Sequence, residues 1–163
     1  MTALVVERVG PAPLAPGRRL PVGPAPAGPP ATHGDVVAPT PPPVTDVVLR
    51  VVLGPRDDWL VPTALAALTA RPWVLTAEAD RVGVRLSVPR LVRVDPAREL
   101  PSEGVVRGAV QVPHSGQPLV FLADHPTTGG YPVVAVVVDG DTDVLAQLRP
   151  GERVRFRRVP RGW

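Results

Sequence analysis

Valine-rich segments of strand length, each ended by a glycine, a proline or an acidic residue, dominate the sequence from Val47 onward. β-Branched and aromatic residues favour strands, whereas glycine and proline favour the turns between them. Several segments, such as VGVRLSV, alternate apolar with polar residues, as a strand with one buried face does. We predict strands over residues 46–54, 73–77, 82–88, 104–113, 118–123, 133–139 and 153–159.

Two short helices are expected between these strands. Residues 62–70, PTALAALTA, favour a helix because Pro62 suits a first turn and alanine and leucine are strong helix formers. We expect Asp57 and Asp58 to cap that helix, and residues 141–148 to form a helical turn capped by Asp141 or Thr142. Short strands with one or two small helices indicate an all-β barrel or sandwich and not a βαβ sheet.

The first part of the chain differs in kind from the rest. Residues 11–43 are dominated by proline, alanine and glycine, and they lack the spaced large apolar side chains that a core requires. Proline fixes φ and removes a backbone donor, so this segment is predicted to be an extended, polyproline-like linker, with Arg18–Gly23 as a possible edge strand. We therefore divide the chain into a segment over 1–46 and a domain over 47–163.

Charge and cysteine content exclude several classes of protein. The formal net charge is only +3, aromatic residues make up 4% of the chain, and every basic residue is an arginine, which argues against a nucleic-acid binder. The absence of cysteine excludes disulfides and thiolate metal sites and fits a cytoplasmic protein. No signal peptide and no apolar run long enough to span a membrane is expected.

Common catalytic and metal-binding motifs are missing. There is neither a Walker phosphate-binding loop nor a Gly-x-Ser-x-Gly nucleophile turn. The three histidines show no ligand spacing, and the acidic residues around Gly140 lack the twelve-position calcium pattern, so no metal site is expected.

Three segments contain more charged, hydroxyl and amide side chains than a simple turn requires: EADRVGVRL (78–86), PSEGVVRGAVQVPHSGQP (101–118) and DHPTTGGYP (124–132). The last lies between two apolar runs, where a two-residue turn would suffice. It is interpreted either as a loop that packs against itself or as a backbone cradle for a ligand. For the first segment, an ion pair between Asp80 and Arg81 that fixes a turn is the structural alternative.

Four stretches taken together resemble a known family: GPRDDW, ADRVGVRL, SEGVVRGAVQVPHSGQPLVFLADHPTTGGYPVVAVV and LAQLRPGERVRF. These sequence motifs, and their order along the chain, are similar to those of the allophanate hydrolase subunit 2 family. This family is also described as subdomains A and B of the biotin-dependent carboxyltransferase, and it includes the C subunit of bacterial 5-oxoprolinase. The resemblance covers about residues 47–159.

The resemblance implies a cyclophilin-like β-barrel and a partner, the subunit 1 protein that carries the remaining carboxyltransferase subdomains. It implies a role in moving a carboxyl group to urea, or in ATP-dependent hydrolysis of 5-oxoproline, with ATP or carboxybiotin used by the complex and no cofactor bound directly. Candidate catalytic residues are Asp124, as a general base, and Tyr131. Candidate substrate-binding residues are Arg81, Gln111, Thr127, Thr128, Gly129 and Gly130, with the glycine amides holding a carboxylate or carbonyl.

The chain departs from the family pattern in one large respect. MTALVVERVGP resembles the first strand of a family member, and the segment after it resembles the linker between two barrels, so the intervening barrel is missing. Ala79, Val82 and Pro126 also replace the serine, methionine and glutamine usual in the family. The alternative to a catalytic subunit is therefore a non-catalytic binding or regulatory barrel that keeps its fold and its partner.

Overall fold

The structure, a computed structural model, describes residues 14–24, 47–87 and 89–160. Residues 14–24 are exposed and contain a turn in which the Arg18 amide donates to the Ala15 carbonyl at 3.1 Å. The possible edge strand over Arg18–Gly23 is wrong, because these residues have no strand structure. The rest of the predicted linker and its boundary with the domain lie outside the described residues.

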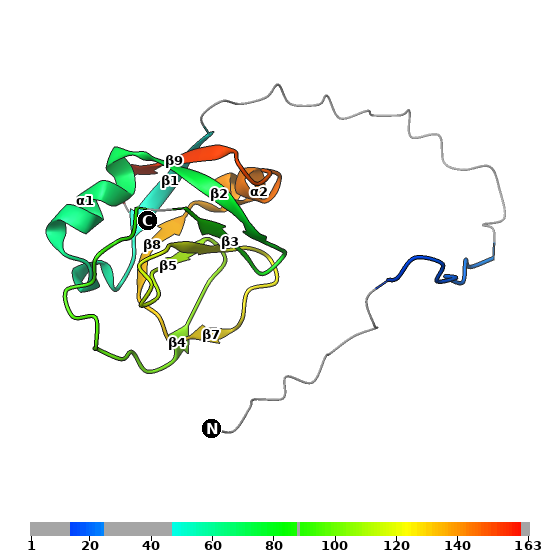
Figure 1. The fold of residues 1–163 in the computed structure, drawn as a ribbon, viewed down its shortest axis with the longest axis horizontal. Helices are drawn as coiled ribbons and strands as arrows, with labels where there is room; N and C mark the ends of the chain where they lie inside the picture. Colours follow the sequence, from blue (N-terminus) through cyan, green and yellow to red (C-terminus); the bar gives the residue numbers. More distant parts are fainter. Residues whose placement is uncertain (1–13, 25–46, 88, 161–163) are drawn as a thin grey trace. The chain divides into compact units, whose positions relative to one another are not determined.

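Seven strands close into a barrel (Figure 1). In their order around the barrel they are β1 (Val47–Leu53), β8 (Val133–Val137), β5 (Ala109–Gln111), β6 (Leu119–Phe121), β3 (Gly83–Leu86), β2 (Pro72–Ala79) and β9 (Arg153–Arg158). The neighbouring strands are antiparallel except β1 and β9, which pair in parallel and close the barrel. The predicted all-β barrel with two short helices is confirmed.

Alternation in the strands places their large apolar side chains inside the barrel. In β1, Val47, Leu49 and Val51 are buried while the residues between them point outward. Leu49 lies opposite Phe156 of β9, which is also buried. Because side chains alternate with a period of two, one face of each strand supplies the core and the other carries residues such as the arginines of β9.

Two helices lie on different sides of the barrel, α1 (Pro62–Ala70) on the left of Figure 1 and α2 (Asp139–Ala146) on the right. Both predicted helices are confirmed, but the predicted caps are wrong. Asp57 and Asp58 form a separate 3₁₀ turn, η1 (Asp57–Trp59), and α1 begins after Val61 without a side-chain cap. Likewise α2 begins at Asp139, two positions before the predicted start. The predicted caps Asp141 and Thr142 therefore lie inside the helix, and its N-cap is Val138, which makes no side-chain hydrogen bond.

The predicted strand over residues 104–113 is broken in two. Its first residues form β4 (Glu103–Gly104), and β5 starts only after Gly108, whose φ of +79° turns the chain. β4 pairs with β7 (Thr128–Gly129), which the sequence did not predict, in a two-stranded ribbon separate from the barrel sheet. The chain leaves the barrel because a residue with positive φ interrupts the extended backbone of a strand.

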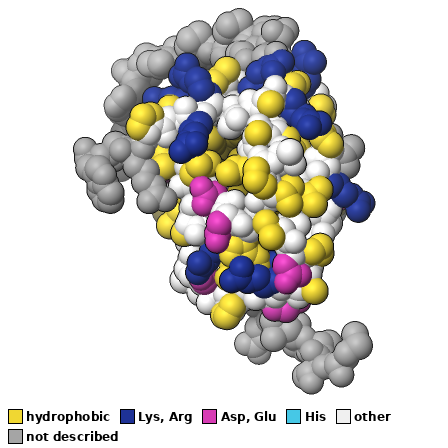
Figure 2. Space-filling view, turned by 90° about the vertical axis from the view of Figure 1, so that its left-hand side faces the viewer, with side chains coloured by type: hydrophobic (Ala, Val, Ile, Leu, Met, Phe, Trp, Pro, Cys, Tyr) yellow, Lys and Arg dark blue, Asp and Glu magenta, His cyan; other side chains and the backbone are white. Residues whose placement is uncertain are grey.

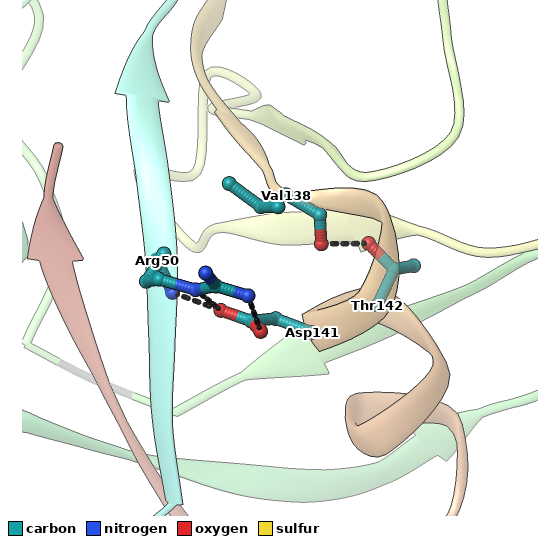
Figure 3. Close-up of polar contacts among 4 residues, drawn as sticks. All are labelled: Arg50, Val138, Asp141 and Thr142. Atoms are coloured by element: carbon teal, nitrogen blue, oxygen red, sulfur yellow. Dashed lines mark hydrogen bonds and ion pairs between the residues drawn. The ribbon is translucent and has the colours of Figure 1, made fainter. Parts of the chain in front are cut away.

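Asp141 binds β1 instead of capping α2 (Figure 3). The Arg50 guanidinium donates from Nε to Oδ2 at 3.0 Å and from Nη2 to Oδ1 at 2.8 Å, and the Arg50 backbone amide donates to Oδ2 at 2.6 Å. These hydrogen bonds, with the positive charge of Arg50, hold the pKa of Asp141 below its usual value. The hydroxyl of the neighbouring Thr142 donates to the Val138 carbonyl at 3.3 Å.

Acid should therefore weaken the attachment of α2. A carboxylate whose pKa is depressed in the folded state stabilises the protein above its unfolded pKa, near 4, and loses this contribution as the pH falls through its folded pKa. We expect Asp141→Asn to lower the free energy of unfolding by about 1–2 kcal/mol at pH 7, and by progressively less below about pH 4. Urea denaturation followed by circular dichroism across this pH range measures the difference.

Asp139→Asn is the matched control. Asp139 also lies in the first turn of α2, but it is exposed and its contact with a guanidinium is longer, 3.7 Å from Oδ1 to Nη1 of Arg107. It should change stability by a few tenths of a kcal/mol, as exposed ion pairs do. A deficit in Asp141→Asn that did not vary with pH would contradict the assignment.

The outward side of α1 is uncharged and mostly apolar, with Thr63 as an exposed polar residue. The helix contains no charged residue, and although Ala64 and Leu68 are buried, Pro62, Ala66 and Ala70 are exposed. Figure 2 shows the side of the molecule on which α1 lies, with hydrophobic side chains across its middle and arginines above and below them. No helix of the described residues is long and apolar enough to cross a membrane.

Candidate functional site

Beside the main core, one residue from each of β5, β6 and β8 packs with Val105, which belongs to a segment that the sequence singled out. A second apolar cluster, formed by Val105, Ala109, Phe121 and Val133, lies outside the main core. The ribbon of β4 and β7 belongs to the same region, since the Val105 amide donates to the Thr127 carbonyl at 3.0 Å. The segments over 101–118 and 124–132 are therefore folded against each other.

Gln111 links the barrel to the loop. Its side chain is 2% exposed, and its Nε2 donates to the Tyr131 carbonyl at 3.0 Å. Gly129 lies against the same amide, because a Cβ placed at Gly129 would be 2.6 Å from Gln111 Nε2. A buried amide that fixes a loop backbone is a positioning element, and a side chain at position 129 would displace it.

Tyr131 lies at the surface next to His114. Its side chain is partly exposed, and its ring meets the imidazole edge-on with centroids 5.8 Å apart. The phenol is therefore available to a ligand, while the backbone of the same residue is held by Gln111. Gln111, Gly129 and Tyr131, three of the predicted site residues, come together in one place.

The other predicted residues of the loop are partly accounted for by structure. Thr128 and Gly129 form β7, which pairs with Gly104 and Glu103. A Cβ at Gly130 would lie 3.5 Å from the Leu100 carbonyl oxygen, so this glycine has ordinary space around it. Neither glycine has a positive φ. The predicted cradle of amides at 129–130 stays a prediction.

Arg81 and Asp124 form a separate pair at the other end of the loop. Arg81 Nε lies 3.3 Å from Asp124 Oδ2, both side chains are exposed, and the Asp124 amide donates to the Arg81 carbonyl at 3.0 Å. Both residues line a cavity of about 520 Å³ with apolar walls that include Leu122 and Leu145. The predicted pairing of Asp80 with Arg81 is replaced: Asp80 Oδ1 accepts from the amides of Val82 and Gly83.

Two features were missed by sequence reasoning. The first is the ion pair of Glu103 with Arg56, whose hydrogen bond lowers the pKa of Glu103 and fixes β4 to the turn before η1. The second is Arg93, which is 5% exposed and lies 5.2 Å from the Trp59 ring centroid. The segment LVRVD gave one available signal, since Leu91 and Arg93 share a face of an extended chain.

Comparison with known proteins assigns the family. The family model for the carboxyltransferase domain, subdomain A and B, matches residues 2–158. The chain belongs to this carboxyltransferase-domain family. The family match reaches further toward the N-terminus than the resemblance, which covered about residues 47–159.

Individual members of the carboxyltransferase-domain family support the assignment. The chain is 39% identical over 108 residues to the C subunit of 5-oxoprolinase from Escherichia coli, an alignment that covers 66% of this chain and 34% of that protein. The crystal structure of TTHA0988 is similar with a TM-score of 0.59 and 35% identity, covering 91% of this chain and 25% of that one. Urea carboxylase of Kluyveromyces lactis shares the fold, with a TM-score of 0.65, 21% identity, and coverage of 71% and 11%.

This carboxyltransferase-domain protein spans about one third of the length of the curated relative from E. coli. Among the residues that the structure describes, no three His, Cys, Asp or Glu side chains are grouped so that they could hold a metal ion. The candidate site therefore consists of the Gln111–Tyr131 region and the Arg81–Asp124 pair, at the two ends of one loop.

Proposed function

We propose that this carboxyltransferase-domain protein is one subunit of an ATP-hydrolysing complex of the 5-oxoprolinase or biotin-dependent carboxyltransferase type. The observation that carries the proposal is its 39% identity to the C subunit of 5-oxoprolinase from E. coli. The substrate is a small amide or urea-like molecule, and the partner is a subunit 1 protein with the remaining carboxyltransferase subdomains. The complex acts in the cytoplasm and uses ATP or carboxybiotin that this chain does not bind directly.

Each candidate residue has a defined task in this proposal. Asp124 is the general base, because it is an exposed carboxylate on the wall of the 520 Å³ cavity. Arg81, which is paired with it, contacts an anionic or carbonyl oxygen of the substrate. Tyr131 orients the substrate through its phenol, Gln111 holds Tyr131 in place, and the backbone of 127–130 offers hydrogen bonds.

Co-expression with a subunit 1 protein tests the proposal. We expect a stable complex on size-exclusion chromatography and ATP-dependent turnover of 5-oxoproline to glutamate. Asp124→Asn should lower kcat at least about 100-fold, since a general base contributes about 10²–10⁴-fold. Asp58→Asn, an exposed carboxylate outside the cavity, should leave turnover unchanged. Failure to form a complex, together with no turnover, would refute the assignment.

A non-catalytic binding or regulatory barrel is the second candidate. It is favoured by the missing barrel, since MTALVVERVGP is followed directly by a segment that resembles the linker between the two barrels of family members. In that case the complex forms without turnover. Thr128→Ala and Tyr131→Phe then leave partner binding and any cellular phenotype unchanged, because the loop has only a structural role.

A further inference from the structure

In the segment over residues 90–96, an arginine is buried while the valines on either side of it are exposed, the reverse of the usual arrangement. Leu91 and Arg93 are buried, whereas Val92 and Val94 between and after them are 57% and 61% exposed. The backbone fixes this order, since the Val61 amide donates to the Val92 carbonyl and the Val94 amide to the Trp59 carbonyl. Local rules of this kind are broken mainly at functional sites.

The buried guanidinium of Arg93 lacks a counter-charge. Nη1 donates to His114 Nδ1 at 2.8 Å and Nη2 donates to the Arg98 carbonyl at 2.5 Å, which leaves the buried Nε without an acceptor. Among the described residues no carboxylate is bonded to Arg93. Buried charges in proteins are normally paired, because the desolvation of an unpaired ion is costly.

Further positive charge surrounds this group. The Arg98 guanidinium lies over the same Trp59 ring as Arg93, with Cζ 4.2 Å from the ring centroid. The π face of Trp59 stabilises a cation but supplies no net negative charge. Two arginines therefore meet at one indole, and within the described residues neither forms an ion pair with an acid. Glu99 lies nearby, but its carboxylate is 3.5 Å from Nε2 of His114 and is bonded to neither arginine.

A cavity of about 200 Å³ opens beside Arg93, between residues 90–96 and the turn 113–116. Its polar lining comes from Arg90, Arg93, His114 and Ser115, and none of its lining residues is an Asp or a Glu. Gly116 holds the turn against the segment: it has a φ of +74°, and its carbonyl accepts from the Leu91 amide at 2.7 Å. The cavity is thus lined by two arginines, a histidine and a serine hydroxyl, and one of the arginines, Arg93, has a buried Nε without an acceptor.

We propose that this cavity, the Arg93 cavity, binds a small oxyanion, that is, the carboxylate or phosphate group of a small molecule. The guanidiniums of Arg93 and Arg90 supply the charge, and the Ser115 hydroxyl supplies a further donor. Planar guanidinium groups match carboxylate and phosphate oxygens in geometry as well as in charge. The proposal does not depend on the proposed function, since it rests on the charge balance of the cavity alone.

The Arg93 cavity is connected to the candidate site. His114 accepts from Arg93 through Nδ1, and its ring meets the edge of Tyr131. Nδ1 also lies 3.0 Å from the Pro96 carbonyl oxygen, but it can donate there only in the tautomer that would deny Arg93 its acceptor. The Arg93 bond therefore selects one tautomer of His114, the residue that separates the cavity from Tyr131.

A titration of the ¹⁵N-labelled full chain tests the proposal by nuclear magnetic resonance. Sodium phosphate and sodium acetate are added in separate series at constant ionic strength, with sodium chloride as the reference anion. We expect saturable shifts of the Ser115 and Gly116 amides and of the Arg93 Nε–H signal with at least one of the two oxyanions. The anion that saturates at the lower concentration identifies the favoured group.

Variants locate the site. Arg93→Gln should weaken binding about 10–100-fold, as loss of a charge-assisted hydrogen bond does, and Arg90→Gln should weaken it less. Arg71→Gln removes an exposed guanidinium outside the cavity and should bind as the original chain does. If Arg93→Gln does not fold, the exposed Arg90 decides the outcome. The proposal is wrong if neither oxyanion gives saturable shifts, if chloride gives the same shifts, or if both cavity variants bind unchanged.

Discussion

Replacing Trp73 with alanine is expected to lower the free energy of unfolding by about 3–5 kcal/mol, the range for truncating a large buried aromatic side chain. Trp73 is 1% exposed and belongs to the main core of the barrel. Its indole Nε1 also donates to the Leu68 carbonyl at 2.9 Å. That carbonyl lies in the last turn of α1, where backbone acceptors have no partner within the helix. The Trp73 side chain thus fills part of the core and also satisfies a carbonyl at the end of α1, so alanine at this position loses both the packing and the hydrogen bond.

Trp73→Phe separates the two contributions. It keeps most of the packing and removes only the donor, so a loss of about 1–2 kcal/mol is expected from the unsatisfied carbonyl and the smaller ring. Urea denaturation followed by circular dichroism measures both variants. Equal losses for alanine and phenylalanine would mean that the hydrogen bond and not the packing dominates, contrary to the prediction.

Gly108→Ala is expected to lower the free energy of unfolding by about 3 kcal/mol, because it adds a backbone clash to a strained conformation. Gly108 has a φ of +79°, and a Cβ there would lie 2.6 Å from the Val137 carbonyl oxygen and 3.0 Å from Thr142 Oγ1. Its amide donates to the Phe121 carbonyl and its carbonyl accepts from the Val137 amide. The new methyl group would therefore push apart β5, β8 and the start of α2.

Gly151→Ala is the matched control for this experiment. Gly151 has a φ of +91°, but a Cβ there would meet nothing within 4 Å. It should lose only about 1–2 kcal/mol, the cost of the left-handed conformation for an L-residue. Thermal and urea denaturation of the two variants give the contribution of the clash as the difference. No difference between them would show that the contact with Val137 relaxes freely.

The barrel strands could be predicted because each carries its own signal. In β9 the alternation of apolar and polar residues agrees with the burial that the structure shows, whereas in β1 the signal is the run of β-branched and other apolar residues. The helix caps could not be predicted, because Asp141 has two possible roles within a few residues. An aspartate just before a helical pattern favours capping. Arg50, however, is 91 positions away in the sequence but close in space, and it forms a bidentate ion pair with Asp141.

The candidate site was only partly visible in the sequence. Gln111 and the loop over 124–132 were singled out by their polar residues, but the hydrogen bond from the Gln111 amide to the Tyr131 carbonyl was not predicted. The pairing of Thr128–Gly129 with Glu103–Gly104 depends on residues about 25 positions apart, and a two-residue strand has too little pattern to detect. Arg93 was missed because an arginine between valines normally predicts an exposed side chain and not a buried one.

The closure of the barrel limits how another chain can attach to it. Every barrel strand has a hydrogen-bonded neighbour on both sides, and β9 completes the ring by pairing with both β1 and β2. A free strand edge is the usual route by which proteins extend a sheet across two chains or aggregate. Within the described residues this route is closed for the barrel. A protein that binds this barrel would therefore have to contact its side chains and loops, and surface substitutions should then abolish binding while leaving the sheet intact.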